Sequence, residues 1–207
     1  MSQWSLEEQC WAQGLQVVCG ADEAGAGPLA GPVYAGAVIL PRYIELKWLN
    51  DSKQVTPRRR DALYDEILAL AETWAVAAVD AAEIDATDIL TARMAAMSRA
   101  IDKLDPAPDF TLVDGNRDKG RGATVTVPHQ CIVKGDSLSA SVAAASILAK
   151  VSRDRYMEEM AKKYPQYRFE RHKGYGTKLH YQMLDQYGPS PIHRLTFLKK
   201  WEAARHG

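Results

Sequence analysis

Short apolar runs recur along the chain and alternate with longer segments whose apolar positions are spaced for a helix. The runs are rich in valine, isoleucine, leucine and alanine, a composition typical of buried strands. Four of them predict strands, at residues 15–20, 31–40, 73–80 and 108–116. Two further runs, "ATVTVP" and "CIVKGD", predict two more strands between residues 123 and 136.

The segments between these runs predict helices. The start, "MSQWSLEEQCWAQG", indicates a short helix with Ser5 and Glu8 spaced as a capping box. Another helix should begin after Thr56, which suits an N-cap and is followed by proline. Longer helices are predicted at 83–104, where the pattern is amphipathic, and at 137–164. Small residues in the early turns of the latter permit close packing on a sheet.

This order of strands and helices predicts one mixed α/β domain over residues 1–207. Roughly residues 1–164 would form its α/β core and roughly 165–207 a basic, helical C-terminal region. Residues 1–149 carry 13 Lys+Arg against 20 Asp+Glu, whereas residues 150–207 carry 13 against 6. An acidic front half and a basic tail suit a protein that gathers metal ions at one place and binds a polyanion nearby.

The composition narrows the class of protein. With 207 residues, 46% of them hydrophobic, the chain is long enough to bury a core of its own. Its three cysteines, Cys10, Cys19 and Cys131, are too scattered for a disulfide framework or zinc ribbon, so we expect reduced thiols. Because neither a signal peptide nor a membrane-length apolar run is present, we expect a soluble, cytoplasmic protein without a membrane partner, and a monomer.

Carboxylates stand at the ends of the predicted strands. Asp22, Glu23, Asp114 and Asp136 follow apolar runs, at the positions where open α/β sheets assemble their sites. Four carboxylates gathered there would repel one another unless a cation joined them. Oxygen ligands select hard ions such as Mg²⁺ or Mn²⁺. Taken singly, Asp114 with the glycine after it is also a common turn, and Asp136 suits an N-cap. Glu23 and Asp22 point to opposite faces of a strand unless the pleat breaks, and the glycines from Gly25 on should supply such a break. Glu23 could then act through its backbone carbonyl or a water as much as through a direct bond.

Glycines follow the first two carboxylates, in "GAGPLAGPV" at residues 25–33. The letters match a dinucleotide-binding pattern, which would make the protein a nucleotide-dependent oxidoreductase. The context argues against this, since Pro28 and the Gly31-Pro32 pair interrupt any helix and a strand follows. Backbone recognition of a ribose is a better use of the turn, because a 2′-hydroxyl both donates and accepts hydrogen bonds and distinguishes RNA from DNA.

With these residues placed, the sequence resembles the type 2 ribonuclease H family, in particular bacterial ribonuclease HII. The resemblance covers roughly residues 15–200 and rests on the ordered blocks "GADEAGAGPLAGPV", "LNDSKQVTPRRR", "EIDATDIL", "LVDGN", "IVKGDSLSASVAAASILAKVSRDRYM" and "HKGYGT…PSPIHR". It implies a ribonuclease H-like fold, with a mixed five-stranded sheet flanked by helices. It also implies cleavage of the RNA strand of RNA–DNA hybrids and nicking 5′ of ribonucleotides embedded in duplex DNA, which leaves a 3′-hydroxyl and a 5′-phosphate.

The same resemblance assigns roles to individual residues. It implies two Mg²⁺ or Mn²⁺ ions, held by the catalytic residues Asp22, Glu23, Asp114 and Asp136. It implies substrate contacts by Gly25, Ala26, Gly27, Lys53, Lys150, Arg153 and Tyr175. The tyrosine would stack on a sugar, although packing in the core is the alternative for an aromatic side chain. The histidines of the basic region, by contrast, are expected to be ordinary surface residues: His172, His180 and His193.

One position departs from the family. The family turn reads Gly-Arg-Gly, where this chain has Gly25-Ala26-Gly27. Backbone contacts to a 2′-hydroxyl would survive the change, whereas a charge-assisted contact to phosphate, worth roughly 1.5–3 kcal/mol, would be lost. We therefore expect weaker substrate binding or a poorer preference for ribonucleotide junctions. The alternative function is a hybrid-binding protein whose catalysis is impaired at Ala26.

Overall fold

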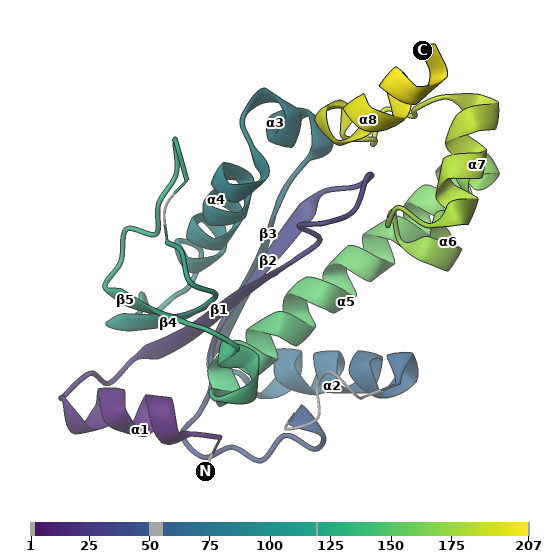
Figure 1. Ribbon diagram of the computed structural model, residues 1–207. Coiled ribbons are helices and arrows are strands. Elements are labelled where there is room, and N and C mark those ends of the chain that lie inside the picture. Colours follow the sequence, from purple (N-terminus) through teal and green to yellow (C-terminus); the bar gives the residue numbers. More distant parts are fainter. Residues whose placement is uncertain (1–2, 50–55, 119, 207) are drawn as a thin grey trace.

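A computed structural model describes residues 3–49, 56–118 and 120–206. Within these ranges, five strands form one mixed sheet in the order β3-β2-β1-β4-β5 (Figure 1). β1, β2 and β3 pair antiparallel, and β4 and β5 run parallel to β1. The strands are β1 (Val18–Ala24), β2 (Val33–Ile39), β3 (Thr73–Val79), β4 (Phe110–Asp114) and β5 (His129–Ile132). The predictions of the first four strands are confirmed, although β1 extends past Asp22.

Helices cover both faces of this sheet. They are α1 (Ser5–Ala12), α2 (Pro57–Leu70), α3 (Ala81–Ala86), α4 (Ile89–Ile101), α5 (Ala140–Lys163), α6 (Phe169–His172), α7 (Lys178–Tyr187) and α8 (Leu195–His206), with 3₁₀ turns η2 (Gly135–Ser137) and η3 (Pro165–Tyr167). The N-cap of α2 is Thr56, as predicted, and its side chain accepts from the Arg59 N–H.

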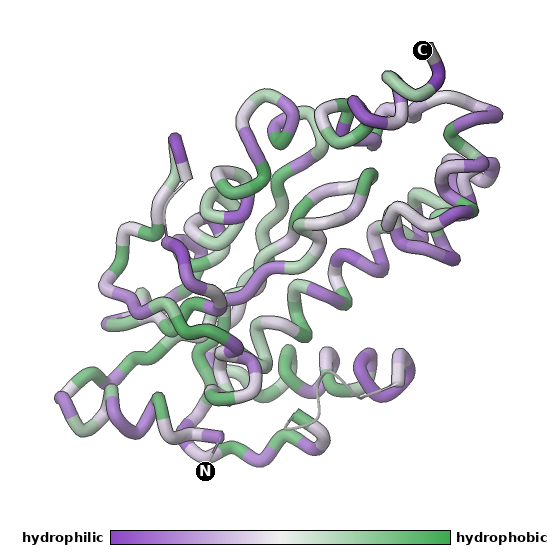
Figure 2. The backbone as a smooth tube through the Cα atoms, viewed as in Figure 1, coloured by the Kyte–Doolittle hydropathy of each residue, from purple (hydrophilic) through white to green (hydrophobic). Residues whose placement is uncertain are grey.

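Alternate residues of the central strands face the two helical layers. Cys19 and Ala21 of β1 pack with Met94 of α4, whereas Val38 of β2 packs with Leu148 of α5. Figure 2 shows hydrophobic residues along the central strands, between the helices. The period of two in β1 therefore directs Gly20 and Asp22 towards α5 and directs Glu23 towards α4.

Helix α5 lies directly on the sheet because glycines leave room for it. A Cβ on Gly20 would stand 2.1 Å from the Ser141 carbonyl carbon, and one on Gly36 would stand 2.4 Å from the Ala145 oxygen. No side chain fits at either distance. The close packing expected from the small residues at the start of this helix is thus present, and it fixes α5 relative to the end of β1.

Three predictions of local structure are wrong. The segment 83–104 forms two helices rather than one, because the Asp88 carboxylate caps a new helix at the Thr91 N–H. "ATVTVP" forms no named strand; Val125 packs in the core without joining the sheet ladder. The capping box is absent, since α1 begins at Ser5 itself and its N-cap makes no side-chain hydrogen bond.

The C-terminal region is helical, as expected; α6 and α7 lie at the far end of α5, whereas α8 lies next to α3 (Figure 1). Met157 of α5 shares a buried cluster with Tyr167 and Phe169. That residues 1–207 fold as one domain stays a prediction. Among the described residues, no helix is long and apolar enough to cross a membrane.

Candidate active site

Asp22 stands near the carboxyl end of β1, on the face that meets α5. Its side chain is buried, and its Oδ1 accepts a hydrogen bond of 2.7 Å from the Glu23 N–H. Burial raises the pKa of Asp22 well above its usual range, and the negative charges of Glu23 and Asp114 raise it further. A hydrogen bond from Ser146 of α5 offsets part of this effect. The carboxylate is therefore costly to ionise unless a cation joins it.

Glu23 faces the other side of the strand, as the pleat requires. There its Oε1 forms an ion pair with Nη2 of Arg93, which comes from α4. Its Oε2 is buried and has no hydrogen-bond partner in the described part of the chain. Burial raises the pKa of Glu23, and the charge of Arg93 counteracts the rise. The glutamate thus keeps one carboxylate oxygen available to a ligand.

Asp114 and Asp136 are brought together by a backbone hydrogen bond. The Gly135 N–H donates to Oδ1 of Asp114 at 2.6 Å, which ties the end of β4 to the η2 turn. Gly115 takes a positive φ of 113°, so the predicted turn after Asp114 is present as well. Asp136 is buried inside η2 rather than at a strand end, because β5 stops at Ile132. It does not cap α5 either, since the N-cap there is Ser139.

The oxygen atoms of the four acids are suitable ligands for a divalent cation, but their side chains are not already arranged around a metal position. Among the described residues, no three His, Cys, Asp or Glu side chains already converge as metal ligands. Every donor in the set is a carboxylate oxygen, which hard ions prefer. The unpartnered Glu23 oxygen and the mutual repulsion felt by Asp22 are both relieved by a bound cation. The residues therefore fit Mg²⁺ or Mn²⁺.

A cavity of about 380 Å³ opens beside these acids. Glu23 and Asp136 line it together with residues from the glycine turn, α2, α5 and the segment before α7: Gly25, Ala26, Gly27, Arg60, Ser146, Lys150 and Tyr175. Lys150 forms an ion pair with Asp154 one helical turn later. Most of the predicted site residues thus border one space.

Two buried arginines hold the glycine turn from inside the protein. Arg194 donates to the carbonyls of Gly25 at 2.6 Å, Ala26 at 3.0 Å and Gly31 at 2.9 Å. Arg153 is 1% exposed and donates to the carbonyls of Ala30 and Pro32. A Cβ on Gly25 would stand 2.1 Å from Nε of Arg153, so only glycine fits there. Arg153 thus supports the turn from behind, and a direct substrate contact by its side chain stays a prediction.

Tyr175 lies at the mouth of the cavity, in front of the glycine turn. Its side chain is 45% exposed, and its Cε1 would be 4.0 Å from a Cβ on Gly27. This exposure disfavours the alternative that the tyrosine packs in the core. Lys53 lies outside the described residues, so its predicted phosphate contact stays a prediction.

The histidines of the C-terminal region are buried, and the expectation of surface positions is wrong. His172, His180 and His193 are 7%, 0% and 3% exposed. The rings of His172 and His180 stack with centroids 4.3 Å apart. Burial lowers the pKa of His180 to about 4 and that of His193 to about 3. We call these three residues the histidine cluster.

Backbone contacts assign the protons in this cluster. The Ser190 N–H donates to Nδ1 of His193 at 2.8 Å, so the proton of that ring is on Nε2. Nε2 of His193 lies 2.9 Å from Nε2 of His180, which must accept. Nδ1 of His180 then donates to the Tyr175 carbonyl at 3.0 Å. His180 and His193 are therefore neutral, and each donates its one ring proton to one acceptor. Through the Tyr175 carbonyl, the cluster fixes the position of the backbone at Tyr175.

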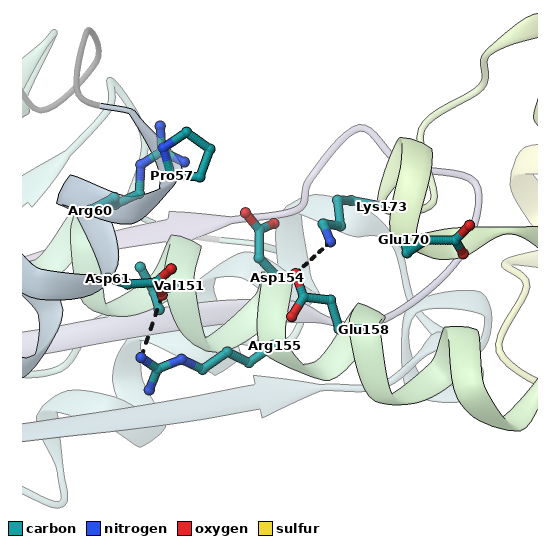
Figure 3. Close-up of a pocket in the computed structure, with 9 residues that line it drawn as sticks. All are labelled: Pro57, Arg60, Asp61, Val151, Asp154, Arg155, Glu158, Glu170 and Lys173. Carbon is teal, nitrogen blue, oxygen red and sulfur yellow. Dashed lines mark hydrogen bonds and ion pairs between the residues drawn. The ribbon is translucent and has the colours of Figure 1, made fainter.

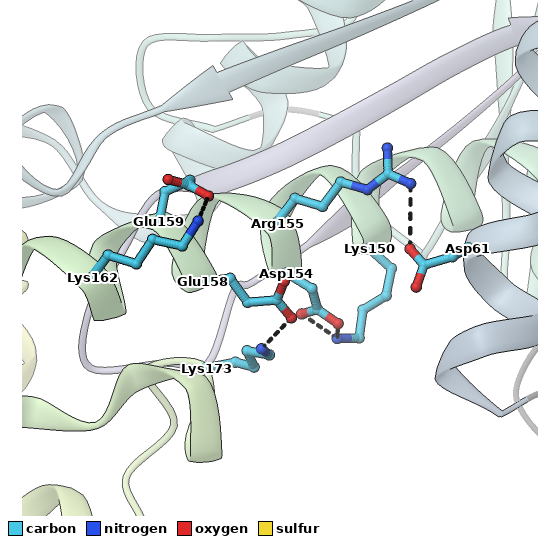
Figure 4. A network of polar contacts seen from close by, with 8 residues as sticks. All are labelled: Asp61, Lys150, Asp154, Arg155, Glu158, Glu159, Lys162 and Lys173. Atoms are coloured by element: carbon cyan, nitrogen blue, oxygen red, sulfur yellow. Dashed lines mark hydrogen bonds and ion pairs between the residues drawn. The ribbon is translucent and has the colours of Figure 1, made fainter. Parts of the chain in front are cut away.

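A second cavity, of about 540 Å³, adjoins the first through the shared residue Arg60 (Figure 3). Its charges are largely paired within the protein: Arg155 contacts Asp61 at 3.4 Å, and Lys173 contacts Glu158 at 2.8 Å (Figure 4). The acidic lining residues outnumber the basic ones, being Asp61, Asp154, Glu158 and Glu170 against Arg60, Arg155 and Lys173. This balance does not favour a phosphate, so we assign the second cavity no substrate.

Sequence reasoning missed two arginines of the site. Nothing local marks Arg93, which occupies a polar position of an amphipathic helix. Arg194 belongs to the block "PSPIHR", so a signal was present but pointed to no role. Both act through contacts with residues far away in the chain, which a one-dimensional pattern does not contain.

Known proteins resemble this chain over most of its length. The family model for Ribonuclease HII matches residues 19–200. A ribonuclease HII from Caldicellulosiruptor bescii is 47% identical over 196 residues, which cover 95% of this chain and 93% of the relative. The solved ribonuclease H2 of Pyrococcus horikoshii has a TM-score of 0.71 at 28% identity, covering 87% of this chain and 93% of its own. Bst-RNase HIII in complex with Mn²⁺ shares the fold, with a TM-score of 0.71 at 20% identity, covering 91% of this chain and 69% of its own.

The likeness confirms the predicted ribonuclease H-like fold and extends over nearly the whole chain. The blocks that carry the acids, the glycine turn and Tyr175 all fall inside the matched range. This chain belongs to the ribonuclease HII family, the endoribonucleases that cleave the RNA strand of RNA–DNA hybrids.

Proposed function

We propose that this enzyme is metal-dependent, with Mg²⁺ or Mn²⁺ as its ion, and that it also nicks 5′ of single ribonucleotides embedded in duplex DNA. The products would carry a 3′-hydroxyl and a 5′-phosphate. The observation that carries the proposal is the set of carboxylates beside the glycine turn: Glu23 and Asp136 line the same cavity as the turn, and Gly135, next to Asp136, donates to Asp114. Metal dependence is general in the family, and Bst-RNase HIII is described with Mn²⁺.

The carboxylates would hold two ions, with Asp22, Glu23, Asp114 and Asp136 as the ligands. When bound, such ions supply an activated water and stabilise the leaving oxygen of the cleaved phosphodiester. Lys150, which lines the same cavity, adds a positive charge for the phosphate, and its pairing with Asp154 fixes its position. Each residue in this set would thus bind or orient the substrate without forming a covalent bond to it.

The glycine turn would recognise the ribose through its peptide N–H groups. A trans peptide directs its carbonyl and the following N–H to opposite sides. Because Arg194 binds the Gly25 and Ala26 carbonyls from inside, the N–H groups of Ala26 and Gly27 point the other way, towards the cavity that these residues line. A cation on the carbonyl also polarises the peptide and strengthens its N–H as a donor. A 2′-hydroxyl is the acceptor such a pair would select.

Tyr175 would stack on a sugar at the mouth of the cavity, where its ring is exposed in front of Gly27. Lys53 would contact a phosphate, as the resemblance implies. Arg153 would contribute mainly by supporting the turn, since its guanidinium binds backbone carbonyls.

The impaired-catalysis alternative has no observation in its favour. The parts of Ala26 that the site uses are its backbone groups, and its carbonyl is held by Arg194. We keep only the weaker expectation that the missing arginine lowers substrate affinity. A monomeric state and a cytoplasmic location stay predictions.

The test uses three 5′-labelled duplexes: one with a single ribonucleotide, one RNA–DNA hybrid and one of DNA alone. We expect nicking of the first two with Mg²⁺ or Mn²⁺, none with EDTA and none of the DNA duplex. Asp22→Asn should be inactive, whereas Asp102→Asn, an exposed aspartate at the end of α4, should act like wild type. Failure to nick the single-ribonucleotide duplex, in this chain and in Ala26→Arg, would refute the junction activity.

A further inference from the structure

Arg93 is a cation in direct contact with Glu23, one of the carboxylates of the proposed metal site. It reaches Glu23 from α4, on the opposite face of the sheet from the Asp22 side chain. The side chains of Arg93 and Glu23 are 28% and 11% exposed, so water screens the pair only partly. The contact is therefore a substantial electrostatic feature of the site rather than a surface ion pair.

The pair is incomplete on both sides. Nε of Arg93 and Oε2 of Glu23 are buried and lack hydrogen-bond partners among the residues that the structure describes. A bidentate arginine–carboxylate pair would satisfy both atoms, and such pairs are the strong ones. The single contact observed here leaves Nε of Arg93 and Oε2 of Glu23 without partners in that part of the chain. A stronger ligand for the carboxylate could therefore displace Arg93 from Glu23.

The guanidinium also lies beside the second strand of the site. Its Nη2 would be 3.9 Å from a Cβ placed on Gly115, the residue that follows Asp114. The positive charge of Arg93 thus lies near the ends of the paired strands β1 and β4. Three carboxylates of the proposed metal site, Asp22, Glu23 and Asp114, stand at these same strand ends. A divalent ion bound through Glu23 would meet this charge at close range, and like charges repel.

We infer that Arg93 is an internal counter-ion of the metal site, which holds Glu23 in the metal-free protein and weakens divalent-ion binding by competing for that carboxylate. The inference rests on the proposed metal site. An ion bound at Oε2 of Glu23 would share the carboxylate with Arg93 and be repelled by its positive charge, so Arg93 lowers the metal affinity without being a ligand. It is a positioning residue, since it acts through Glu23.

The test measures Mn²⁺ binding alone, by calorimetry at about pH 8 and without nucleic acid. We expect Arg93→Gln to bind Mn²⁺ about tenfold more tightly than wild type, because the competing charge is gone. Its melting temperature in EDTA should be lower, and its rise on adding Mn²⁺ larger. Arg93→Lys keeps the charge and should stay near the wild-type affinity, which separates loss of charge from loss of packing.

Arg99→Gln is the matched control. Arg99 lies on the same helix and pairs with Glu83, away from the site, so its loss should leave the Mn²⁺ affinity unchanged. Equal or weaker Mn²⁺ binding by folded Arg93→Gln would overturn the inference while leaving the metal site intact. If neither wild type nor Arg93→Gln bound Mn²⁺, the proposed metal site and this inference would both be wrong. Should Arg93→Gln not fold, Arg93→Lys with tenfold altered affinity would also contradict the role assigned to charge.

Discussion

Acidification should destabilise the protein through its histidine cluster. His180 and His193 are neutral and fully hydrogen-bonded, so no ring can take a second proton without losing a contact. A proton on Nδ1 of His193 would face the Ser190 N–H, and one on Nε2 of His180 would face the N–H of His193. In the unfolded chain both rings titrate with an ordinary pKa. Acid therefore favours the unfolded state.

The size of the effect follows from linkage. The pKa of His180 is lowered to about 4, and that of His193 to about 3. The stability these neutral rings contribute is complete above the unfolded pKa of 6.5 and is lost as the pH falls towards the folded values. Between about pH 7 and about pH 5 the loss is about 2 kcal/mol for each ring taken separately. Since the rings share a hydrogen bond, we expect about 2–4 kcal/mol for the pair, out of the roughly 5–15 kcal/mol typical of a folded protein.

Urea unfolding followed by circular dichroism measures this loss. Wild type should lose stability steadily over this pH window, with the metal removed so that binding does not contribute. His193→Asn keeps an acceptor for the Ser190 N–H but removes one ring, so it should be less stable at neutral pH and show a flatter pH dependence. Gln130→Ala, an exposed position of β5 outside the cluster that removes no titratable group, should keep the wild-type slope. Equal slopes in wild type and His193→Asn would refute the assigned protonation states.

Three further predictions concern the site and its support. Asp22→Asn should raise the melting temperature in EDTA while abolishing cleavage, because burial and two neighbouring negative charges raise the pKa of Asp22 and make its ionised form costly. Arg194→Met should lower the free energy of unfolding by about 3 kcal/mol, since three carbonyls lose charged donors. It should also reduce the preference for single-ribonucleotide over all-DNA duplexes in nicking assays, and Arg194→Lys should restore part of it. Gly36→Ala should lower the free energy of unfolding, measured in urea, by about 1–3 kcal/mol, because its Cβ would stand 2.4 Å from the Ala145 oxygen. Gly122→Ala is the control, since its Cβ would meet no atom closer than 3.9 Å.

Features set by short-range chemistry could be predicted from the sequence. The apolar runs of β1 to β4 are dense in strand-forming residues, and Thr56 marks the start of α2 by a cap that the structure contains. Three of the acids, Asp22, Glu23 and Asp114, lie at or next to strand ends, which is why a periodicity argument reached them before any resemblance was considered; Asp136 lies in the η2 turn instead. The break in the pleat expected from the glycines does not occur at Glu23, because β1 continues to Ala24 and the Glu23 side chain faces away from Asp22 and meets α4.

The rest depends on partners that are distant in the chain. The helical period runs on through residues 83–104, and only the Asp88 cap divides it. Histidines are usually partly exposed, and nothing local shows that three of them would meet in one buried cluster. Arg93 and Arg194 read as ordinary surface charges until the fold places a strand end or a turn against them.

The hydrogen bonds from Arg194 to the glycine turn span almost the entire chain. They join residues 168 and 169 positions apart, so the turn cannot acquire its shape from its own neighbourhood. Closing so long a loop is entropically costly, and the ends meet only when the sheet and α5 have brought them together. If the turn recognises the ribose as proposed, substrate choice would depend on complete folding. A chain whose C-terminal segment had not docked would carry its acids without the means of telling ribose from deoxyribose.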